Sequence, residues 1–135
     1  MQELELKLRN DLSKIGLDVD FNLSIRPYSS SYFGRYDINT STIILYVQKT
    51  PRGEMYPYEE LLLTTIHEAI HCLQWHSPDY KRVKGVMHDL EFHRLYALYS
   101  NRAKARILFK EALDYAQSFE KVGRECSNFS NICCH

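Results

Sequence analysis

The sequence lacks any apolar run that could cross a membrane or act as a secretory signal. Its first ten residues, MQELELKLRN, are charged from the third residue onward, whereas a signal peptide needs a continuous apolar segment. A membrane-spanning helix needs about 18 or more consecutive apolar residues, and no segment provides them. These absences predict a protein that does not enter a membrane.

Cysteine is scarce and unevenly distributed. One cysteine lies within a helical pattern, and the other three lie close to the C-terminus: Cys72, Cys126, Cys133 and Cys134. Small secreted domains distribute their paired cysteines through the chain. The spacing therefore predicts a reduced intracellular protein, cytoplasmic or, in a eukaryote, nuclear.

Internal repeats and low-complexity linkers are also missing, which predicts one domain over residues 1–125 followed by a short cysteine-rich tail, 126–135. The tail could form a second metal site or be a frayed end. Its candidate ligands are Cys126, Cys133, Cys134 and His135. Adjacent ligands at 133–135 suit a tetrahedral site poorly.

The hydrophobic periodicity predicts an α+β domain. Residues 2–15 have helical spacing and end before Gly16, and an alternating strand follows from Val19 to a stop at Pro27. Segments 31–37 and 43–47 complete a small three-stranded antiparallel sheet. Helical periodicity resumes over 57–75 and, after a loop at 77–87, over 89–122, with a break expected near Ser100.

The motif His67-Glu68-Ala69-Ile70-His71 lies in the first of these later helices. Histidines at i and i+4 lie one turn apart on one helix face and can bind one metal ion. Glu68 points about 100° away from His67, which suits a general base that contacts water rather than the metal. The motif predicts a zinc-dependent peptidase with His67 and His71 as ligands and Glu68 as base.

A catalytic zinc needs a third protein ligand, for which the downstream candidates are His76, His88, Glu91 and His93. His88 is favoured, because it follows a long loop and precedes a helix start that Asp89 could cap. Glu91 would instead give a gluzincin-like site. Tyr80, Tyr96 and Arg94 lie near this region as candidate stabilisers of an oxyanion, and the spacing does not select among them.

Two segments, HEAIH and HDLEFHRL, together resemble the SprT-like metallopeptidases and their relatives with the WLM domain. The stretch FGRYDINTSTIILYV also resembles the small sheet of that family, and the similarity extends over about residues 20–100. The resemblance implies a zincin-like fold, zinc bound by His67, His71 and His88, and Glu68 as base. It also implies that Phe92 and Leu95 pack the ligand-bearing helix against the core.

The resemblance further implies hydrolysis of DNA-associated proteins, as in DNA repair. Segment 81–110 carries eight Lys and Arg against two Asp and Glu, so it could contact DNA or simply form a solvated helix surface. The zinc ribbon with paired C-x-x-C motifs found in bacterial relatives is missing. The alternatives are a minimal gluzincin that cleaves another protein, or a metal-containing binding module that does not cleave.

One further alternative concerns substrate binding. The strand at 43–47 could pair with an extended peptide by β-augmentation, or it could be an ordinary member of the sheet.

Overall fold

The computed structural model describes residues 2–80 and 85–123, with side chains up to residue 118. It has three helices and three strands, in the order α1 (Gln2–Lys14), β1 (Asn22–Tyr28), β2 (Gly34–Asp37), β3 (Thr42–Gln48), α2 (Tyr58–His76) and α3 (Leu90–Gly123). The α+β class predicted from the sequence is confirmed. The chain divides into two compact units, Met1–Ala103 and Lys104–His135, and α3 contributes residues to both.

The first helix ends where the sequence predicts. Leu8 and Leu12 are buried, and they begin the apolar face that packs against the rest of the first unit. Gly16 has a φ of +83°, a left-handed conformation that glycine adopts without steric cost. The amide of Leu17 then donates to the carbonyl of Leu12 at 3.0 Å, which closes the helix end.

The sheet differs from the prediction, because it is mixed rather than purely antiparallel. Its strand order is β1-β3-β2. β3 lies between the other two strands, parallel to β1 and antiparallel to β2. The chain therefore crosses from one edge of the sheet to the other after β1, and β3 returns between the two edges. β1 also continues past Pro27 to Tyr28, which is possible because an edge strand tolerates proline.

The burial of β3 explains its central position. Ile43, Ile44, Leu45 and Val47 are all buried, so side chains on both faces of this strand are covered. A continuous apolar run is the pattern of a strand buried on both faces, whereas alternation marks a half-exposed strand. β3 is thus an interior member of the sheet, and β2 is an edge whose outer side pairs with no other described strand.

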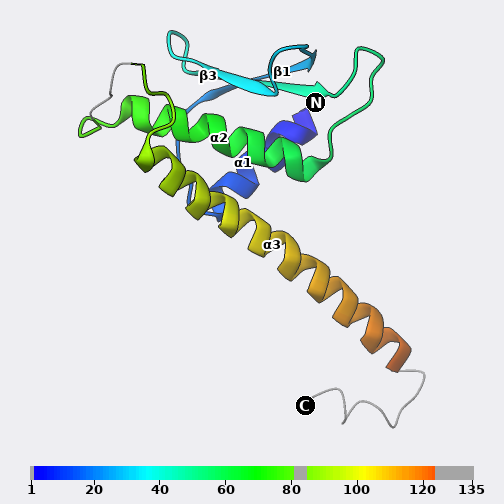
Figure 1. Cartoon of the computed structure of the whole chain (residues 1–135). Helices are drawn as coiled ribbons and strands as arrows, with labels where there is room; N and C mark the ends of the chain where they lie inside the picture. Colours follow the sequence, from blue (N-terminus) through cyan, green and yellow to red (C-terminus); the bar gives the residue numbers. More distant parts are fainter. Residues whose placement is uncertain (1, 81–84, 124–135) are drawn as a thin grey trace. The chain divides into compact units, whose positions relative to one another are not determined.

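Helix α2 packs against the sheet over β2 and β3, and α1 and α2 lie on the same side of the sheet (Figure 1). Its observed start, one residue after Pro57, and its end at His76 agree with the prediction within one residue. The apolar residues of α2 that join the core are Leu61, Leu62, Ile66, Ala69, Ile70 and Cys72. No helix among the described residues is long and apolar enough to span a membrane.

Helix α3 runs without interruption from Leu90 to Gly123, so the break expected near Ser100 does not occur. Ser100 is itself buried, and its hydroxyl donates to the carbonyl of Ala97. This local bond lets a serine remain inside a helix without disturbing it.

Candidate metal centre

Helix α2 brings the motif residues to the open side of the core. Ile66 and Ile70 are fully buried, while His67 and His71 are half-buried on the flank of the same helix. The apolar positions fix the rotation of the helix about its axis. The two imidazoles therefore face the same side, with ring centroids 5.0 Å apart.

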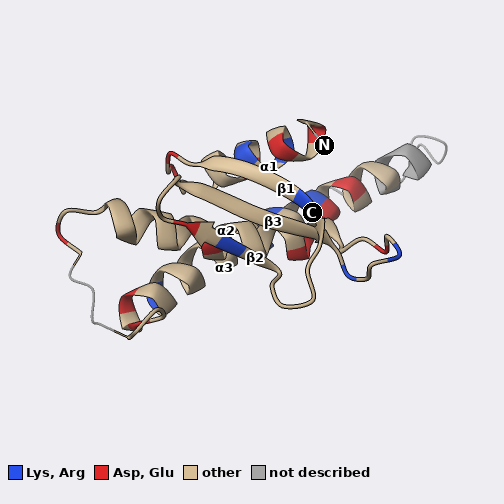
Figure 2. Ribbon diagram, turned by 90° about the horizontal axis from the view of Figure 1, so that it is seen from above, with Lys and Arg blue, Asp and Glu red and all other residues tan. Residues whose placement is uncertain are grey.

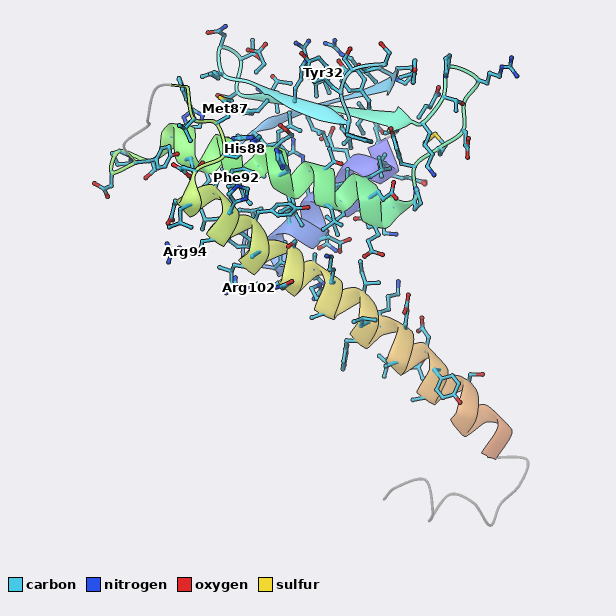
Figure 3. The ribbon with its side chains drawn as sticks, in the orientation of Figure 1. Tyr32, Met87, His88, Phe92, Arg94 and Arg102 are labelled. Atoms are coloured by element: carbon cyan, nitrogen blue, oxygen red, sulfur yellow. The ribbon has the colours of Figure 1, made fainter. Side chains whose placement is uncertain are left out.

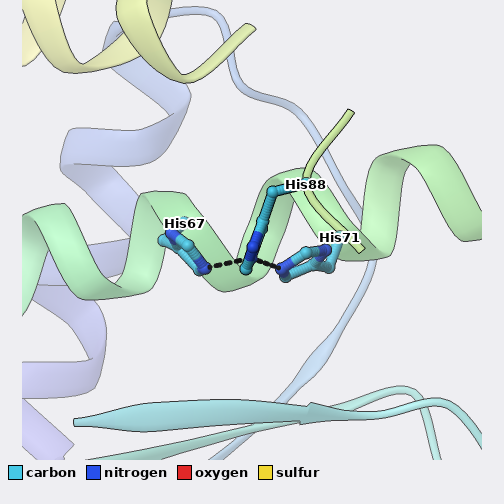
Figure 4. A group of neighbouring side chains, drawn as sticks. All are labelled: His67, His71 and His88. Carbon is cyan, nitrogen blue, oxygen red and sulfur yellow. Dashed lines mark hydrogen bonds between the residues drawn. The ribbon is translucent and has the colours of Figure 1, made fainter. Parts of the chain in front are cut away.

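His88 reaches the two helical histidines from the segment that precedes α3 (Figure 4). Its Nε2 atom lies 3.1 Å from Nε2 of His71 and 3.1 Å from Nε2 of His67. Among the described residues, these three side chains form a group whose ligand atoms all lie within 4.8 Å of one another. The structure thus brings together the three histidines proposed from the sequence.

The arrangement of the nitrogens fits a shared cation better than hydrogen bonding. A neutral imidazole nitrogen either donates one proton or accepts one, so Nε2 of His88 cannot satisfy both neighbours at once. Nitrogens bound to one tetrahedral zinc at about 2.0–2.1 Å would lie about 3.3 Å apart, close to the observed 3.1 Å. Three neutral imidazoles are also a donor set that zinc accepts in catalytic sites, with a fourth position left for water.

Phe92 supports all three imidazoles from beneath. Its ring centroid lies 4.8 Å from that of His67, 4.6 Å from that of His71 and 4.7 Å from that of His88. The ring is stacked on His71, with an interplanar angle of 24°, and the side chain is only 2% exposed. One buried aromatic residue therefore fixes the orientation of the three rings (Figure 3).

The position of His88 is fixed by its neighbour, Asp89. One carboxylate oxygen of Asp89 accepts from the backbone amide of Phe92 at 2.8 Å, so Asp89 caps α3 as predicted. The same oxygen accepts from the side-chain amide of Gln74 on α2 at 3.4 Å, and the other accepts from the Tyr80 hydroxyl. These bonds, led by the one from Tyr80, lower the pKa of Asp89. We call the three residues Asp89, Gln74 and Tyr80 the Asp89 clamp; it ties the loop that carries His88 to α2.

Glu68 lies beside the histidine group and next to the edge strand. The side chain is 6% exposed, and burial raises its pKa to about 7. A carboxylate with such a pKa can both accept and release a proton near neutral pH. Burial, together with the charges of His88 and His93, lowers the pKa of His67 to about 4. The imidazole of His67 is therefore neutral near pH 7.

Gly34 permits the close approach of β2 to Glu68. A Cβ atom at Gly34 would lie 2.9 Å from Cγ2 of Thr64, 3.0 Å from the carbonyl oxygen of Ile44 and 3.6 Å from Cγ of Glu68. A side chain at this position would therefore require Thr64 to move and the backbone of Ile44 to shift slightly. Glycine at this point therefore sets the width of the gap between the edge strand and α2.

The histidines and Glu68 open into a cleft of about 730 Å³ between β2 and α2. Its wall includes Phe33, Trp75 and Met87, whose side chains are 65%, 40% and 57% exposed. Tyr96 also lines the cleft. Its ring centroid lies 5.8 Å from that of His67, and burial raises the pKa of its hydroxyl, so that the group remains protonated.

The other candidates have different partners. Glu91 pairs with Arg94 through both carboxylate oxygens at 2.9 Å and 2.7 Å, and neither residue belongs to the group of possible ligands. His93 is exposed, with its ring centroid 6.4 Å from that of His88. His76 lies next to the hydroxyls of Tyr36 and Ser41, at 2.9 Å and 3.2 Å from its Nε2 atom.

Several predicted features lie outside the described residues: Cys126, Cys133, Cys134, His135 and the basic residues Lys81, Arg82 and Lys84. Two of the remaining basic residues of segment 81–110 have internal contacts. Arg94 pairs with Glu91, and Arg102 donates to the carbonyl of Ile15 at 3.0 Å. Lysine and arginine are interspersed with acidic residues in the view from above (Figure 2).

The sequence interpretation missed Gly34 and the Asp89 clamp. A glycine within a strand pattern is a signal of close backbone approach, so the FGRYD segment could have identified Gly34. Gln74 and Tyr80 carried no comparable signal, because their contact with Asp89 depends on the path of the loop between them.

Neither the protein-family models nor the curated protein sequences match this chain. A similar solved structure is the crystal structure of the metallopeptidase zymogen of Pyrococcus abyssi abylysin. The two chains are 22% identical, with a TM-score of 0.48, over 79% of this chain and 93% of that chain. The function proposed below therefore rests on the geometry of this chain's own residues.

Proposed function

We propose that this protein is a zinc-dependent endopeptidase. The observation that carries the proposal is the convergence of Nε2 of His67, His71 and His88 beside the buried carboxyl group of Glu68, at the edge of an open cleft. A purely structural metal site would be closed by four protein ligands, whereas a catalytic site keeps one position open. Three histidines next to a candidate base match the catalytic type.

In this proposal the three histidines would hold the zinc, with Phe92 and the Asp89 clamp fixing their positions. When bound, zinc supplies Lewis-acid chemistry, lowering the pKa of water and polarising a carbonyl group. A carboxylate oxygen of Glu68 accepts the proton of the attacking water and later delivers it to the leaving amine nitrogen. Burial of Glu68 beside the cleft excludes competing water from this proton transfer.

The proposed substrate is an extended segment of a protein. The outer edge of β2 pairs with no other described strand and lies beside Glu68, so a substrate strand could add to this edge by β-augmentation. This would hold the scissile bond across the cleft between β2 and α2. The edge strand, rather than the interior strand at 43–47, is therefore the proposed docking site.

The test compares the wild-type chain with Glu68→Gln after loading with zinc. We expect the wild type to cleave a mixture of unstructured protein substrates, and Glu68→Gln to bind one zinc per chain while losing cleavage, because glutamine cannot accept the proton. Cleavage is followed by mass spectrometry, and bound zinc by elemental analysis. Glu91→Gln is the matched control and should retain both properties. Unchanged cleavage by Glu68→Gln would overturn the proposed role of this residue.

More specifically, the proposed enzyme is a SprT-like peptidase that cleaves DNA-associated proteins. This assignment is supported by the motif pair and by the exposed cations Lys104, Arg106 and Lys110 at the end of the basic segment. We expect single-stranded DNA to increase the cleavage rate, and the increase to disappear at high salt because phosphate contacts are salt-sensitive. Cleavage that does not respond to DNA at low salt would favour a different protein substrate.

A further inference from the structure

The second unit of the chain exposes large apolar side chains along α3. Leu108 is 64% exposed, Phe109 70%, Leu113 46% and Tyr115 71%. These four residues occur within three turns of one helix, and in a monomer all would contact water. Contiguous exposed apolar surface of this kind marks an interaction site.

Four apolar residues of segment 104–118 follow a heptad spacing, whereas Ile107 lies on the other side of the helix. Ala105, Leu108, Ala112 and Tyr115 are separated by three, four and three residues, and in the sequence Phe119 and Val122 continue the same spacing. At about 100° per residue, Phe109 and Leu113 extend this stripe along one flank. The charged residues of the segment occupy the remaining side of the helix. This is the pattern of a helix that pairs with another helix.

The sizes of the core residues favour an antiparallel partner with the same sequence. Small residues, Ala105 and Ala112, alternate with large ones, Leu108 and Tyr115. In an antiparallel pair each small position faces a large position of the other helix, so every layer holds one small and one large side chain. A parallel pair would place alanine against alanine and tyrosine against tyrosine, which leaves alternating voids and overcrowded layers.

The charges of the segment point to the same arrangement. The cations Lys104, Arg106 and Lys110 come first along the helix, and the anions Glu111 and Asp114 follow. An antiparallel copy places the basic half of each helix beside the acidic half of the other. A parallel copy would place like charges side by side, which is unfavourable.

We propose that the apolar face of segment 104–118 is the interface through which two copies of this chain form an antiparallel helical pair. The partner is a second copy, because both the size alternation and the charge polarity of this segment are self-complementary under a twofold axis. The inference does not depend on the proposed peptidase activity.

The experiment is sedimentation equilibrium of the zinc-loaded full chain over a roughly hundredfold range of protein concentration. We expect a monomer–dimer equilibrium for the wild type. Leu108→Glu combined with Tyr115→Glu should abolish the dimer, because the change places charges in the interface. Both side chains are highly exposed in the single chain, so its folding and zinc content should be unchanged. The matched control, Gln117→Ser combined with Ser118→Gln, changes two exposed polar residues without altering the charge of the segment and should retain the dimer.

A second pair of variants tests the orientation. Glu111→Lys with Asp114→Lys makes the segment uniformly basic and should weaken an antiparallel dimer at least tenfold. Adding Lys104→Glu and Arg106→Glu gives the segment an acidic half and a basic half again, in reversed order, and should restore dimerisation. A chain that stays monomeric throughout would overturn the proposal and assign the face to a different partner. A dimer unaffected by Leu108→Glu with Tyr115→Glu would also overturn it, and one unaffected by the charge reversal would exclude the antiparallel arrangement.

Discussion

The three proposed zinc ligands are positioned in two different ways. His67 and His71 lie one turn apart on α2, so the helix itself sets the separation of their rings. His88 precedes α3 and reaches the same point because the Asp89 clamp ties its loop to α2. Two of the ligands thus depend on local backbone geometry, and the third depends on tertiary contacts.

This difference predicts where the site tolerates change. Disturbing the helical pair requires replacement of a ligand or of Phe92, because α2 itself is held by buried residues from Leu61 to Gln74. Disturbing His88 requires only the loss of a contact at its neighbour. The site should therefore be more sensitive to changes around His88 than to changes around the helical pair.

The largest effect is expected from removing a ligand of either kind. His67→Ala and His88→Ala should each eliminate stoichiometric zinc binding and, with it, cleavage, because two imidazoles cannot hold a catalytic zinc. His93→Ala is the matched control for His88, since it lies five residues further along the chain, within α3 and outside the ligand group, and it should bind zinc normally. Retention of zinc by His88→Ala, measured by equilibrium titration with a chelator, would contradict the ligand set.

A smaller effect is expected when the support of His88 is removed. Asp89→Ala should weaken zinc binding by about 10–100-fold, the range seen when residues supporting a ligand are lost. It should also destabilise the fold by about 1 kcal/mol through loss of the helix cap. Asp89→Asn retains one oxygen that can accept from the Phe92 amide but places an NH2 group where the other oxygen accepts from Tyr80, so it should recover the cap and only part of the zinc affinity. Equal zinc affinities of Asp89→Ala and wild type, in the same titration, would show that the clamp does not position His88.

A still more selective effect is expected from Gly34→Ala. The added Cβ must displace Thr64 or the edge strand, which widens the cleft beside Glu68 without touching a ligand. Zinc affinity should be unchanged while kcat/KM for a peptide falls. Thr64→Ser in the same chain removes one of the two close contacts and should restore part of the rate. If Gly34→Ala lowers zinc binding and cleavage in parallel, the strand instead supports the metal centre as a whole.

The smallest effect concerns a contact far from the cleft. The Tyr58 hydroxyl donates to Asp11 at 2.5 Å and links α2 to α1, and burial together with this bond raises the pKa of Tyr58. Tyr58→Phe should lower the free energy of unfolding by about 1 kcal/mol, as measured by urea denaturation. Zinc affinity and cleavage should not change. A change in zinc affinity would mean that the contact between α1 and α2 helps to position the zinc ligands.

Local patterns predicted much of the fold and the helical part of the site. Periodicity located the helices, Gly16 and Asp89 marked a helix end and a helix start, and the i, i+4 spacing placed His67 and His71 on one face. Each of these features is decided by residues within about one or two turns of one another.

Features set by tertiary contacts were harder to predict. The sheet was expected to be antiparallel because consecutive strands usually pair, yet β3 inserts between β1 and β2. The unbroken apolar run of β3 was the available sign, since only a central strand buries both faces. The convergence of His88 could be proposed from its place after a loop, but Gln74 and Tyr80 become its supports only once that loop has folded.

The central claim is that His67, His71 and His88 bind one zinc with a fourth position open. X-ray absorption spectroscopy of the zinc-loaded chain tests it directly, with His88→Ala and Glu91→Gln measured alongside. We expect three imidazole nitrogens at about 2.0–2.1 Å and one further light ligand. Glu91→Gln should leave this spectrum unchanged, whereas His88→Ala should lose one imidazole signal or the zinc itself. A spectrum with two imidazoles that changes on Glu91→Gln, or one with sulfur ligands, would contradict the proposed centre.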